Sequence, residues 1–393
     1  MMHYDVVIIG GGLGGLECGT LLAQRGFGVC VLEKNPRLGG CLQTFVRHGL
    51  TFDTGFHYVG GLADGQPLHR IFSQLDLLDL PWHRLDENAF DEVFLAGERY
   101  RFANGYQHFA DTLLEDFAAN GHEPDAQSVA GLRAYAALMK EIGDNTFRNL
   151  EGHSSEELSA ESYFAQSAYQ FLNQHIKDEK MVAVLAGASL KMELKRETLP
   201  LYTFAQINSS FVQSAWRLRG GGEQLAEHLA SSIEKKGGVV RRRATVSKIV
   251  EKAGRVVAVE LESGERIEGN DFICNLHPAN MVALLDAENT SMKKISRKRL
   301  SGFDNTFGML TVQVALKAGR VPYRNCNLFI HNDIENVWNA NETLTPYAER
   351  SLMVSYQVPE AGSHDCRNLD ILMPLYWSEV SQWTGTQVGR RGE

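Results

Sequence analysis

The 393-residue sequence contains only six cysteines, and no two of them form a C-x-x-C pair. This scatter argues against a zinc site or a disulfide framework, and it is typical of a protein from a reducing cytosol. We therefore expect no metal centre. Cys18 and Cys30 fall within the first strand-helix-strand pattern, where we expect both to be small core residues.

Long apolar runs and a basic charge excess are also missing. No uninterrupted apolar run reaches the ~18–20 residues of a membrane span, and Asp5 leads directly into a strand pattern rather than a leader peptide. The formal net charge is −9, which predicts no nucleic-acid partner and fits a cytoplasmic protein. Peripheral membrane contact stays open because residues 68–78 carry an amphipathic apolar stripe, although we favour packing of that stripe within the protein.

The most informative segment is the strand, glycine turn and helix that begin the chain. Val6–Ile9 is an apolar run typical of a buried parallel strand. Gly10, Gly12 and Gly15 form G-x-G-x-x-G directly after it. The first glycine allows a tight turn, the second lets a pyrophosphate approach the backbone, and the third lets the helix pack closely. The helix N-terminus then offers N–H groups to an anion.

A carboxylate completes this unit. Val29–Leu32 is the second predicted strand, and Glu33 ends it at the place where a carboxylate can accept both hydroxyls of a ribose. Strand, glycines, helix, second strand and acidic residue within about 30 residues predict a dinucleotide site rather than an empty glycine turn. Glu33 also argues against a ribose 2′-phosphate, because two anions would repel each other.

Two further strings carry a family resemblance. Arg37-Leu-Gly-Gly40 follows Glu33, and residues 49–60 read GLTFDTGFHYVG. Together they resemble the FAD-binding amine oxidase-like superfamily, and within it the phytoene desaturase, carotenoid isomerase and all-trans-retinol 13,14-reductase (retinol saturase) branch. The resemblance implies FAD as cofactor. It also implies an α/β fold, with a three-layer Rossmann-like FAD-binding domain and a discontinuous α+β substrate domain.

The resemblance further implies which residues hold the cofactor and act on the substrate. The glycine pair 39–40 is expected against the phosphates, and the backbone of Val246 against the adenine. His57 lies on the loop that the family places near the flavin ring and is the candidate acid–base residue, with a structural histidine as the alternative. Lys191, Lys195 and Arg196 are further polar candidates, for which neither the spacing nor the resemblance gives an argument. The expected cofactor-binding residues are Gly10, Gly12, Leu13, Gly14, Gly15, Glu33, Lys34, Arg37, Gly39, Gly40, Val246 and Asn275.

A second block of the superfamily begins with Arg217-Leu-Arg-Gly-Gly-Gly222 and continues through a predicted helix and several short strands. We expect an FAD-binding domain from residues 1–62 and 217–290, and a substrate domain from 63–216 and 291–393. Residues 63–215 are expected to be helical, and strands are expected in 309–377. Family members close with a C-terminal segment that covers the flavin ring. We expect that segment to be missing, because the chain ends at Glu393 without it.

The resemblance implies an FAD-dependent oxidoreductase that acts on CH–CH groups, or C=C bonds, of a polyene or isoprenoid. Saturation, desaturation and isomerisation stay open as reactions. The expected partners are the apolar substrate and an electron donor or acceptor. The sequence has no Ser-His-Asp arrangement and no H-E-x-x-H motif, so the flavin carries the chemistry. An amine oxidase-type flavoenzyme and a non-catalytic or incomplete FAD-binding protein are the alternatives.

Overall fold

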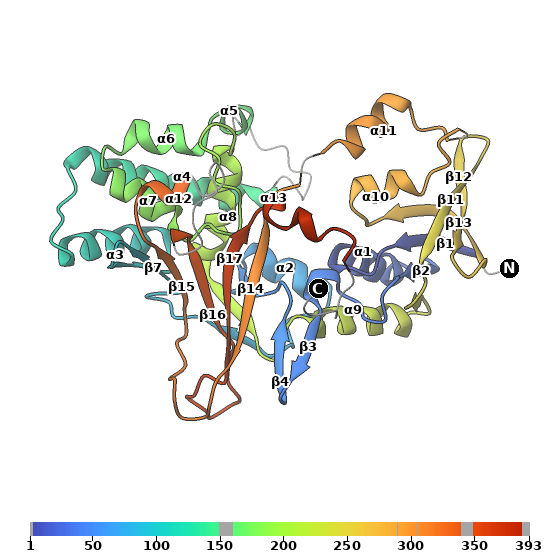
Figure 1. The fold of residues 1–393 in the computed structure, drawn as a ribbon, viewed down its shortest axis with the longest axis horizontal. Coiled ribbons are helices and arrows are strands. Elements are labelled where there is room, and N and C mark those ends of the chain that lie inside the picture. Colours follow the sequence, from blue (N-terminus) through green and yellow to red (C-terminus); the bar gives the residue numbers. More distant parts are fainter. Residues whose placement is uncertain (1–2, 149–159, 289, 304, 339–348, 387–393) are drawn as a thin grey trace. The chain divides into compact units, whose positions relative to one another are not determined.

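The computed structural model describes residues 3–148, 160–288, 290–303, 305–338 and 349–386 (Figure 1). The chain divides into two compact units, one of residues 1–57, 70–82 and 220–305 and one of residues 58–69, 83–219 and 306–393. Each unit contains a six-stranded sheet. The chain end at 389–393, on which we base the missing closing segment, lies outside the described residues.

The first unit is built on a mostly parallel sheet with the strand order β10-β2-β1-β13-β12-β11. β1 pairs in parallel with β2 and β13, β10 pairs in parallel with β2, and β11 and β12 form an antiparallel edge. All of β2 and the end of β1 are buried, as expected for strands covered on both faces. The strands are β1 (His3–Ile9), β2 (Val29–Leu32), β10 (Val239–Arg241), β11 (Val246–Lys252), β12 (Arg255–Leu261) and β13 (Arg266–Cys274).

Helices α1 (Leu13–Gln24) and α9 (Glu223–Lys235) pack closely together in this unit. A Cβ added to Gly19 would lie 2.9 Å from the Ile233 Cδ1 atom, so this crossing needs a glycine. Cys30 is buried, but our prediction for Cys18 is wrong, since Cys18 is exposed. The buried face of α1 follows a spacing of three and four residues that excludes position 18, and it consists of Gly15, Leu16, Gly19, Thr20 and Ala23.

The other elements of the first unit are short. A 3-10 turn, η1, precedes a two-stranded hairpin, and two helices follow the last strand of the sheet. These elements are η1 (Gly40–Leu42), β3 (Thr44–Arg47), β4 (Leu50–Asp53), α10 (Pro278–Ala283) and α11 (Lys294–Ser301).

The second unit joins strands from two distant parts of the chain in one sheet, with the order β14-β17-β16-β15-β7-β8. β7 pairs in parallel with β15, although more than 200 residues separate the two (Figure 1). The strands are β7 (Asp91–Leu95), β8 (Glu98–Phe102), β14 (Gly308–Ala315), β15 (Asn327–His331), β16 (Leu352–Tyr356) and β17 (Asn368–Leu375).

Strands β7 and β8 correct the prediction that residues 63–215 are helical. They form a hairpin whose two turn residues, Ala96 and Gly97, have φ of +50° and +87°. Two consecutive positive φ values are typical of the two-residue turns that match strand twist. A three-stranded sheet adds further strands, with the order β5-β9-β6, formed by β5 (Val59–Gly60), β6 (Trp82–Arg84) and β9 (Ala215–Leu218).

Helices cover one face of the second sheet and enclose a large aromatic and aliphatic core. A Cβ added to Gly187 would lie 2.5 Å from the Val93 Cγ1 atom, so α7 contacts β7 through a glycine. None of the described helices combines the length and apolar character needed to cross a bilayer. The helices of this part are α3 (Tyr106–Ala119), α4 (Ala126–Arg148), α5 (Ala160–Ala165), α6 (Ala168–His175), α7 (Glu179–Gly187), α8 (Leu201–Gln213), α12 (Glu335–Trp338) and α13 (Trp377–Val380), followed by η3 (Ser381–Trp383). The boundary between the two units falls within α2 (Pro67–Gln74), of which residues 70–74 belong to the first unit.

Residues 70–82 and 291–305 belong to the first unit, whereas our sequence boundaries put both in the substrate domain. The Gln24 side chain donates a hydrogen bond to the Gln74 carbonyl oxygen (3.0 Å), which ties the first of these segments to α1. Ser291 N donates to Glu251 Oε2 (2.8 Å), which ties the second to the edge strand β11. The assignment of one function to each domain stays a prediction.

Candidate functional site

Two glycines of the turn after β1 are required by the packing of the protein itself. Gly10 has φ of +105°, and a Cβ there would lie 2.6 Å from the Asn275 carbonyl oxygen. A Cβ on Gly15 would lie 2.2 Å from the Gly10 carbonyl oxygen. These two positions therefore let α1 start directly above the end of β1, as the G-x-G-x-x-G spacing predicts.

Gly12 and Gly14 lie in less crowded surroundings. Gly12 has φ of −75° and ψ of 176°, which any residue can adopt, and the nearest atom to an added Cβ is the Asn275 Nδ2 atom at 3.4 Å. At Gly14 the nearest atom is Asn275 Oδ1 at 3.2 Å. No side chain caps α1, which begins at Leu13. A helix N-terminus with a bare backbone beside it suits the close approach of a pyrophosphate.

Glu33 braces this turn from the end of β2. It is 6% exposed, Oε2 accepts a hydrogen bond from Gly11 N (2.9 Å), and Oε1 accepts one from Asn35 N (2.8 Å). A carboxylate has about four acceptor positions, so two remain for ribose hydroxyls. Ala244 N donates to the Glu33 carbonyl oxygen (2.8 Å), which brings the segment before Val246 to this corner.

The second glycine pair lies against the first turn. Gly39 N donates to the Gly11 carbonyl oxygen (2.8 Å), and the nearest atom to a Cβ on Gly40 is Gly12 Cα at 3.5 Å. Arg37 donates to the Thr44 carbonyl oxygen and forms an ion pair with Glu223 Oε2 (3.4 Å). This arginine therefore holds the hairpin and the start of α9, a role that the sequence analysis missed.

Asp53 links two blocks that are far apart in the sequence. Its Oδ1 atom accepts a hydrogen bond from Gly222 N (2.7 Å), and Gly221 beside it has φ of +91°. The strings TFDTG and RLRGGG were both noted in the sequence, but no local signal pairs them. Of the remaining predicted residues, His57 is half-buried in the loop after β4, Lys34 is exposed, and Val246 starts β11.

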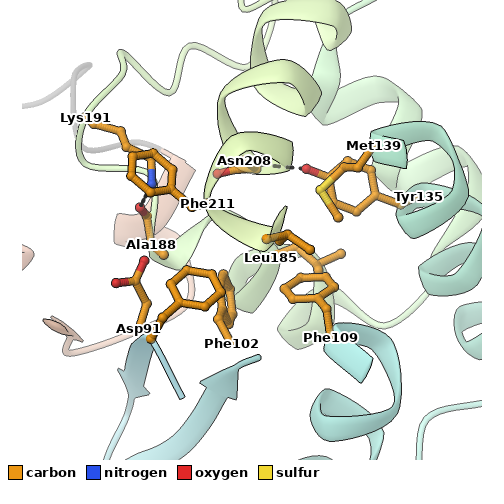
Figure 2. Close-up of a pocket in the computed structure, with 12 residues that line it drawn as sticks. Asp91, Phe102, Phe109, Tyr135, Met139, Leu185, Ala188, Lys191, Asn208 and Phe211 are labelled. Atoms are coloured by element: carbon orange, nitrogen blue, oxygen red, sulfur yellow. Dashed lines mark hydrogen bonds between the residues drawn. The ribbon is translucent and has the colours of Figure 1, made fainter. Parts of the chain in front are cut away.

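A second polar cluster lies in the other unit and was not predicted as a group. Tyr58 Oη donates to Asp91 Oδ2 (2.9 Å), and Lys191 Nζ donates to Tyr58 Oη (3.2 Å) and to the Ala188 carbonyl oxygen (3.0 Å). Asn327 Nδ2 donates to Asp91 Oδ1 (2.7 Å). Figure 2 shows Lys191 and Asp91 on one side of a pocket, with Phe211 beside Lys191 and with Tyr135 and Phe109 on the opposite side.

The cluster continues as a buried polar row across the sheet. Asp91, Asn327, Ser355 and Asp370 are in register on four neighbouring strands, and each is at most 1% exposed. Arg217 donates to Asn327 Oδ1 and to the Cys326 carbonyl oxygen (3.1 Å). The side chains of a strand alternate between its faces, so four in-register polar residues share one face.

Burial shifts the acidities in this cluster. Loss of hydration lowers the pKa of Lys191 to about 8, against the opposing effect of Asp91. Burial also raises the pKa of Asp91, although Lys191 and Asn327 oppose the shift, and raises the pKa of Tyr58, with a further contribution from Asp91. Burial raises the pKa of Asp370 to about 6. The sequence named Lys191 as a polar candidate, but no spacing connects it to Tyr58 or Asp91.

The pocket beside Lys191 is small. Its volume is about 10 Å³, and Phe102, Phe109 and Tyr135 are among the residues that line it (Figure 2). This is close to the minimum that a single water molecule needs. An extended apolar molecule therefore does not fit inside this cavity as it stands.

The parallel sheet, the glycine turn, the carboxylate at the end of β2 and the second glycine pair define a dinucleotide-binding protein of the flavoprotein type. The family model described as "Flavin containing amine oxidoreductase" matches residues 13–369. The chain belongs to this family of flavin oxidoreductases, and its cofactor is FAD. The predictions of the superfamily and of the cofactor are confirmed.

Curated relatives carry names from retinoid and carotenoid chemistry. All-trans-retinol 13,14-reductase of Danio rerio is 30% identical over 268 residues, which are 63% of this chain and 42% of that protein. The Rattus norvegicus protein of the same name is 27% identical, over 99% of this chain and 68% of that protein. Prolycopene isomerase 2 of an Oncidium hybrid is 26% identical, over 90% of this chain and 61% of that protein. The chain thus spans less than half of the first relative.

Solved structures share the fold. An oxidoreductase from Methanosarcina mazei has a TM-score of 0.65 at 17% identity, and covers 97% of this chain and 81% of its own. A variant of putrescine oxidase has a TM-score of 0.62 at 16% identity, over 98% of this chain and 78% of its own. These likenesses confirm the predicted α/β fold class.

Proposed function

We propose that this protein is an FAD-dependent oxidoreductase that acts on CH–CH groups or C=C bonds of a polyene or isoprenoid, as a saturase, desaturase or isomerase. The observation that carries the proposal is the match to all-trans-retinol 13,14-reductase over 99% of the chain. The prolycopene isomerase match supports the same substrate class. An apolar polyene is therefore the substrate, and an external electron donor or acceptor completes any net redox cycle.

The residues of the first unit bind and orient the cofactor in this proposal. The backbone of Gly12, Leu13 and Gly14 receives the pyrophosphate at the start of α1, and Glu33 accepts the ribose hydroxyls. FAD, when bound, supplies hydride transfer at its flavin ring. The remaining proposed cofactor contacts are those of Gly10, Gly15, Lys34, Arg37, Gly39, Gly40, Val246 and Asn275.

His57 is the proposed acid–base residue of this unit. It follows Asp53, which is fixed to Gly222, so the loop that carries His57 is anchored at its start. A positioned acid assists the reaction because protonation of a polyene creates an allylic cation that can accept a hydride. The alternative of an amine oxidase rests on the description of the family.

A single stopped-flow experiment tests the proposal against that alternative. The FAD-loaded protein is reduced with dithionite without oxygen and then mixed with all-trans-retinol or with prolycopene. We expect either flavin reoxidation together with a saturated product, or an isomerised product while the flavin stays reduced, with the products separated by chromatography. Reduction of the oxidised enzyme by putrescine, with no reaction of either polyene, would instead establish an amine oxidase. His57→Gln should slow the polyene reaction without loss of FAD.

A further inference from the structure

We propose that Lys191 binds a carboxylate at the end of an apolar chain, so that the substrate is an acid rather than a pure hydrocarbon. This inference rests on the proposed function, since it specifies the end group of that same apolar substrate. It is carried by the hydrogen bonds and ring contacts of the cluster that Lys191 forms with Tyr58, Asp91 and Phe211.

The ammonium of Lys191 has an unused hydrogen-bond donor. An ammonium carries three N–H donors. One reaches the Ala188 carbonyl oxygen and one reaches Tyr58 Oη. Within the described part of the chain these two are its hydrogen bonds, and Lys191 is exposed. The third donor is therefore available to a ligand.

Within this cluster, Lys191 is the residue that can donate a hydrogen bond to a ligand. The Tyr58 hydroxyl already donates a hydrogen bond to Asp91, and its oxygen accepts a hydrogen bond from Lys191. Asp91 is fully buried and accepts a second hydrogen bond from Asn327. The accessible group is thus a cationic donor, which selects an acceptor and binds an anionic acceptor most strongly.

The surroundings of this ammonium favour an apolar acid over a small inorganic anion. Nζ lies 4.0 Å from the centroid of the Phe211 ring and 5.5 Å from that of Tyr58. The rings of Tyr58 and Phe211 exclude water from one side of the ammonium. Their cation–π attraction replaces only part of the hydration energy that is lost there. A carboxylate that approaches from solvent restores the lost solvation, and its attached chain can lie against the partly exposed side chains of Tyr58 and Phe211 rather than in the small cavity.

The protonation state of Lys191 predicts how carboxylate binding depends on pH. The charged or titratable groups that face Lys191 are Tyr58 and Asp91, with Arg217 behind them, and Arg217 also faces Asp370. Lys191 has a pKa of about 8, so it is protonated below that pH and neutral above it. Carboxylate binding should therefore be constant below pH 8 and weaken above it.

The test uses the full, FAD-loaded chain and two probes with the same polyene, all-trans-retinoic acid and all-trans-retinol. Affinities are measured by quenching of tryptophan fluorescence. At pH 7 we expect the acid to bind about tenfold more tightly than the alcohol, as for a charge-assisted hydrogen bond. Lys191→Met should abolish this preference, and Lys191→Arg should keep most of it. Lys180→Met is the matched control, because Lys180 already pairs with Glu98 (2.9 Å).

The pH series and a third probe separate this inference from the proposed function. Between pH 7 and 10 the acid should lose in the wild type the roughly tenfold advantage that the charged Lys191 supplies, mostly above pH 8, while the affinity of the alcohol should not change. Lys191-dependent binding of palmitate without reaction of any polyene would overturn the proposed function and retain the inference. Turnover of retinol with equal affinity for the acid and the alcohol, or a preference that survives in Lys191→Met, would overturn the inference. Circular dichroism and thermal melting verify that each variant is folded.

Discussion

At the scale of single residues, Glu33 has two tasks that share one carboxylate. It accepts the N–H groups of Gly11 and Asn35, and so it holds the glycine turn in place before any ligand arrives. Its remaining acceptor capacity then faces the ribose hydroxyls in the proposed complex. A substitution here should consequently affect both the turn and the cofactor.

Glu33→Gln tests this double role. Glutamine keeps the length of the side chain but replaces one acceptor oxygen with a donor, so one backbone N–H loses its partner. We expect the dissociation constant for FAD, measured by titration of flavin fluorescence, to rise about tenfold. Glu262→Gln is the control, because Glu262 is exposed. Equal FAD affinity in the wild type and Glu33→Gln would refute the assignment of Glu33 to the ribose.

His331 makes stability depend on pH. It is 3% exposed, with Nδ1 2.7 Å from Ser351 Oγ and Nε2 2.8 Å from the Gly187 carbonyl oxygen. Burial lowers its pKa to about 4, so the folded protein resists protonation that the unfolded chain accepts near pH 6.5. Stability from this residue is therefore complete above pH 6.5 and falls as the pH drops towards 4.

His331→Gln should remove this dependence. The free energy of unfolding of the wild type, relative to His331→Gln, should fall by about 3 kcal/mol from pH 7 to pH 4. Urea denaturation at both pH values measures this difference. His108→Gln, at an exposed histidine, serves as the control. A constant difference between the wild type and His331→Gln would contradict a neutral buried His331.

At the scale of elements, the turn between β1 and α1 contains two kinds of glycine. One kind is required by the packing of the protein, and the other leaves space for a ligand. A Cβ on Gly15 meets the Gly10 carbonyl oxygen at 2.2 Å, whereas a Cβ on Gly12 meets its nearest atom at 3.4 Å. Gly12 also has ordinary backbone angles. The two positions therefore allow folding and ligand binding to be disturbed separately.

Gly12→Ala and Gly15→Ala form a matched pair. Gly12→Ala should fold with nearly the thermal melting point of the wild type, while its FAD affinity falls about tenfold or more, because the new methyl group occupies the pyrophosphate approach. Gly15→Ala should lower the melting point strongly even without FAD, because α1 can no longer pack on β1. Full FAD affinity in Gly12→Ala would contradict the proposed position of the pyrophosphate.

At the scale of the whole molecule, the two units are each assembled from distant parts of the chain. The second sheet depends on the parallel pairing of β7 with β15, and Phe329 in β15 is 1% exposed within the large core. Residues 91–95 thus pair with a strand that follows 236 residues later, while β8 pairs with β7 in a local hairpin. We therefore expect β7 and β15 to unfold together, so that a substitution that destabilises one strand also destabilises the other.

Phe329→Ala tests this coupling by native-state hydrogen exchange. Removal of a buried phenylalanine costs about 3–5 kcal/mol, and we expect this loss to appear in the amides of β7, β8 and β15 together. Val7→Ala is the counterpart in the first unit, where β1, β2 and β13 should lose protection together. Faster exchange in β15 with unchanged exchange in β7 would show that the two strands do not form one cooperative sheet.

The sequence alone predicted the features that depend on neighbours in the chain. The first strand, the glycine turn, α1, β2 and Glu33 lie within 33 residues, and turn geometry and hydrophobic pattern are enough to specify them. The parallel return of residues 271–275 beside β1 follows from the same unit, and β13 does pair in parallel with β1. The fold class and the FAD cofactor follow from these local features and from the family strings.

Only the tertiary structure decided the features that depend on long-range pairing. Residues 91–95 lie inside the second sheet because β15 provides their second set of hydrogen-bond partners, and Cys18 is exposed because the opposite face of α1 packs in the core. The contact of Asp53 with Gly222 and the cluster of Lys191 with Tyr58 and Asp91 likewise have no sequence signal. Such contacts form where the packing of distant segments outweighs local secondary-structure propensity. A single sequence indicates that propensity, but it does not show which distant segments pack together.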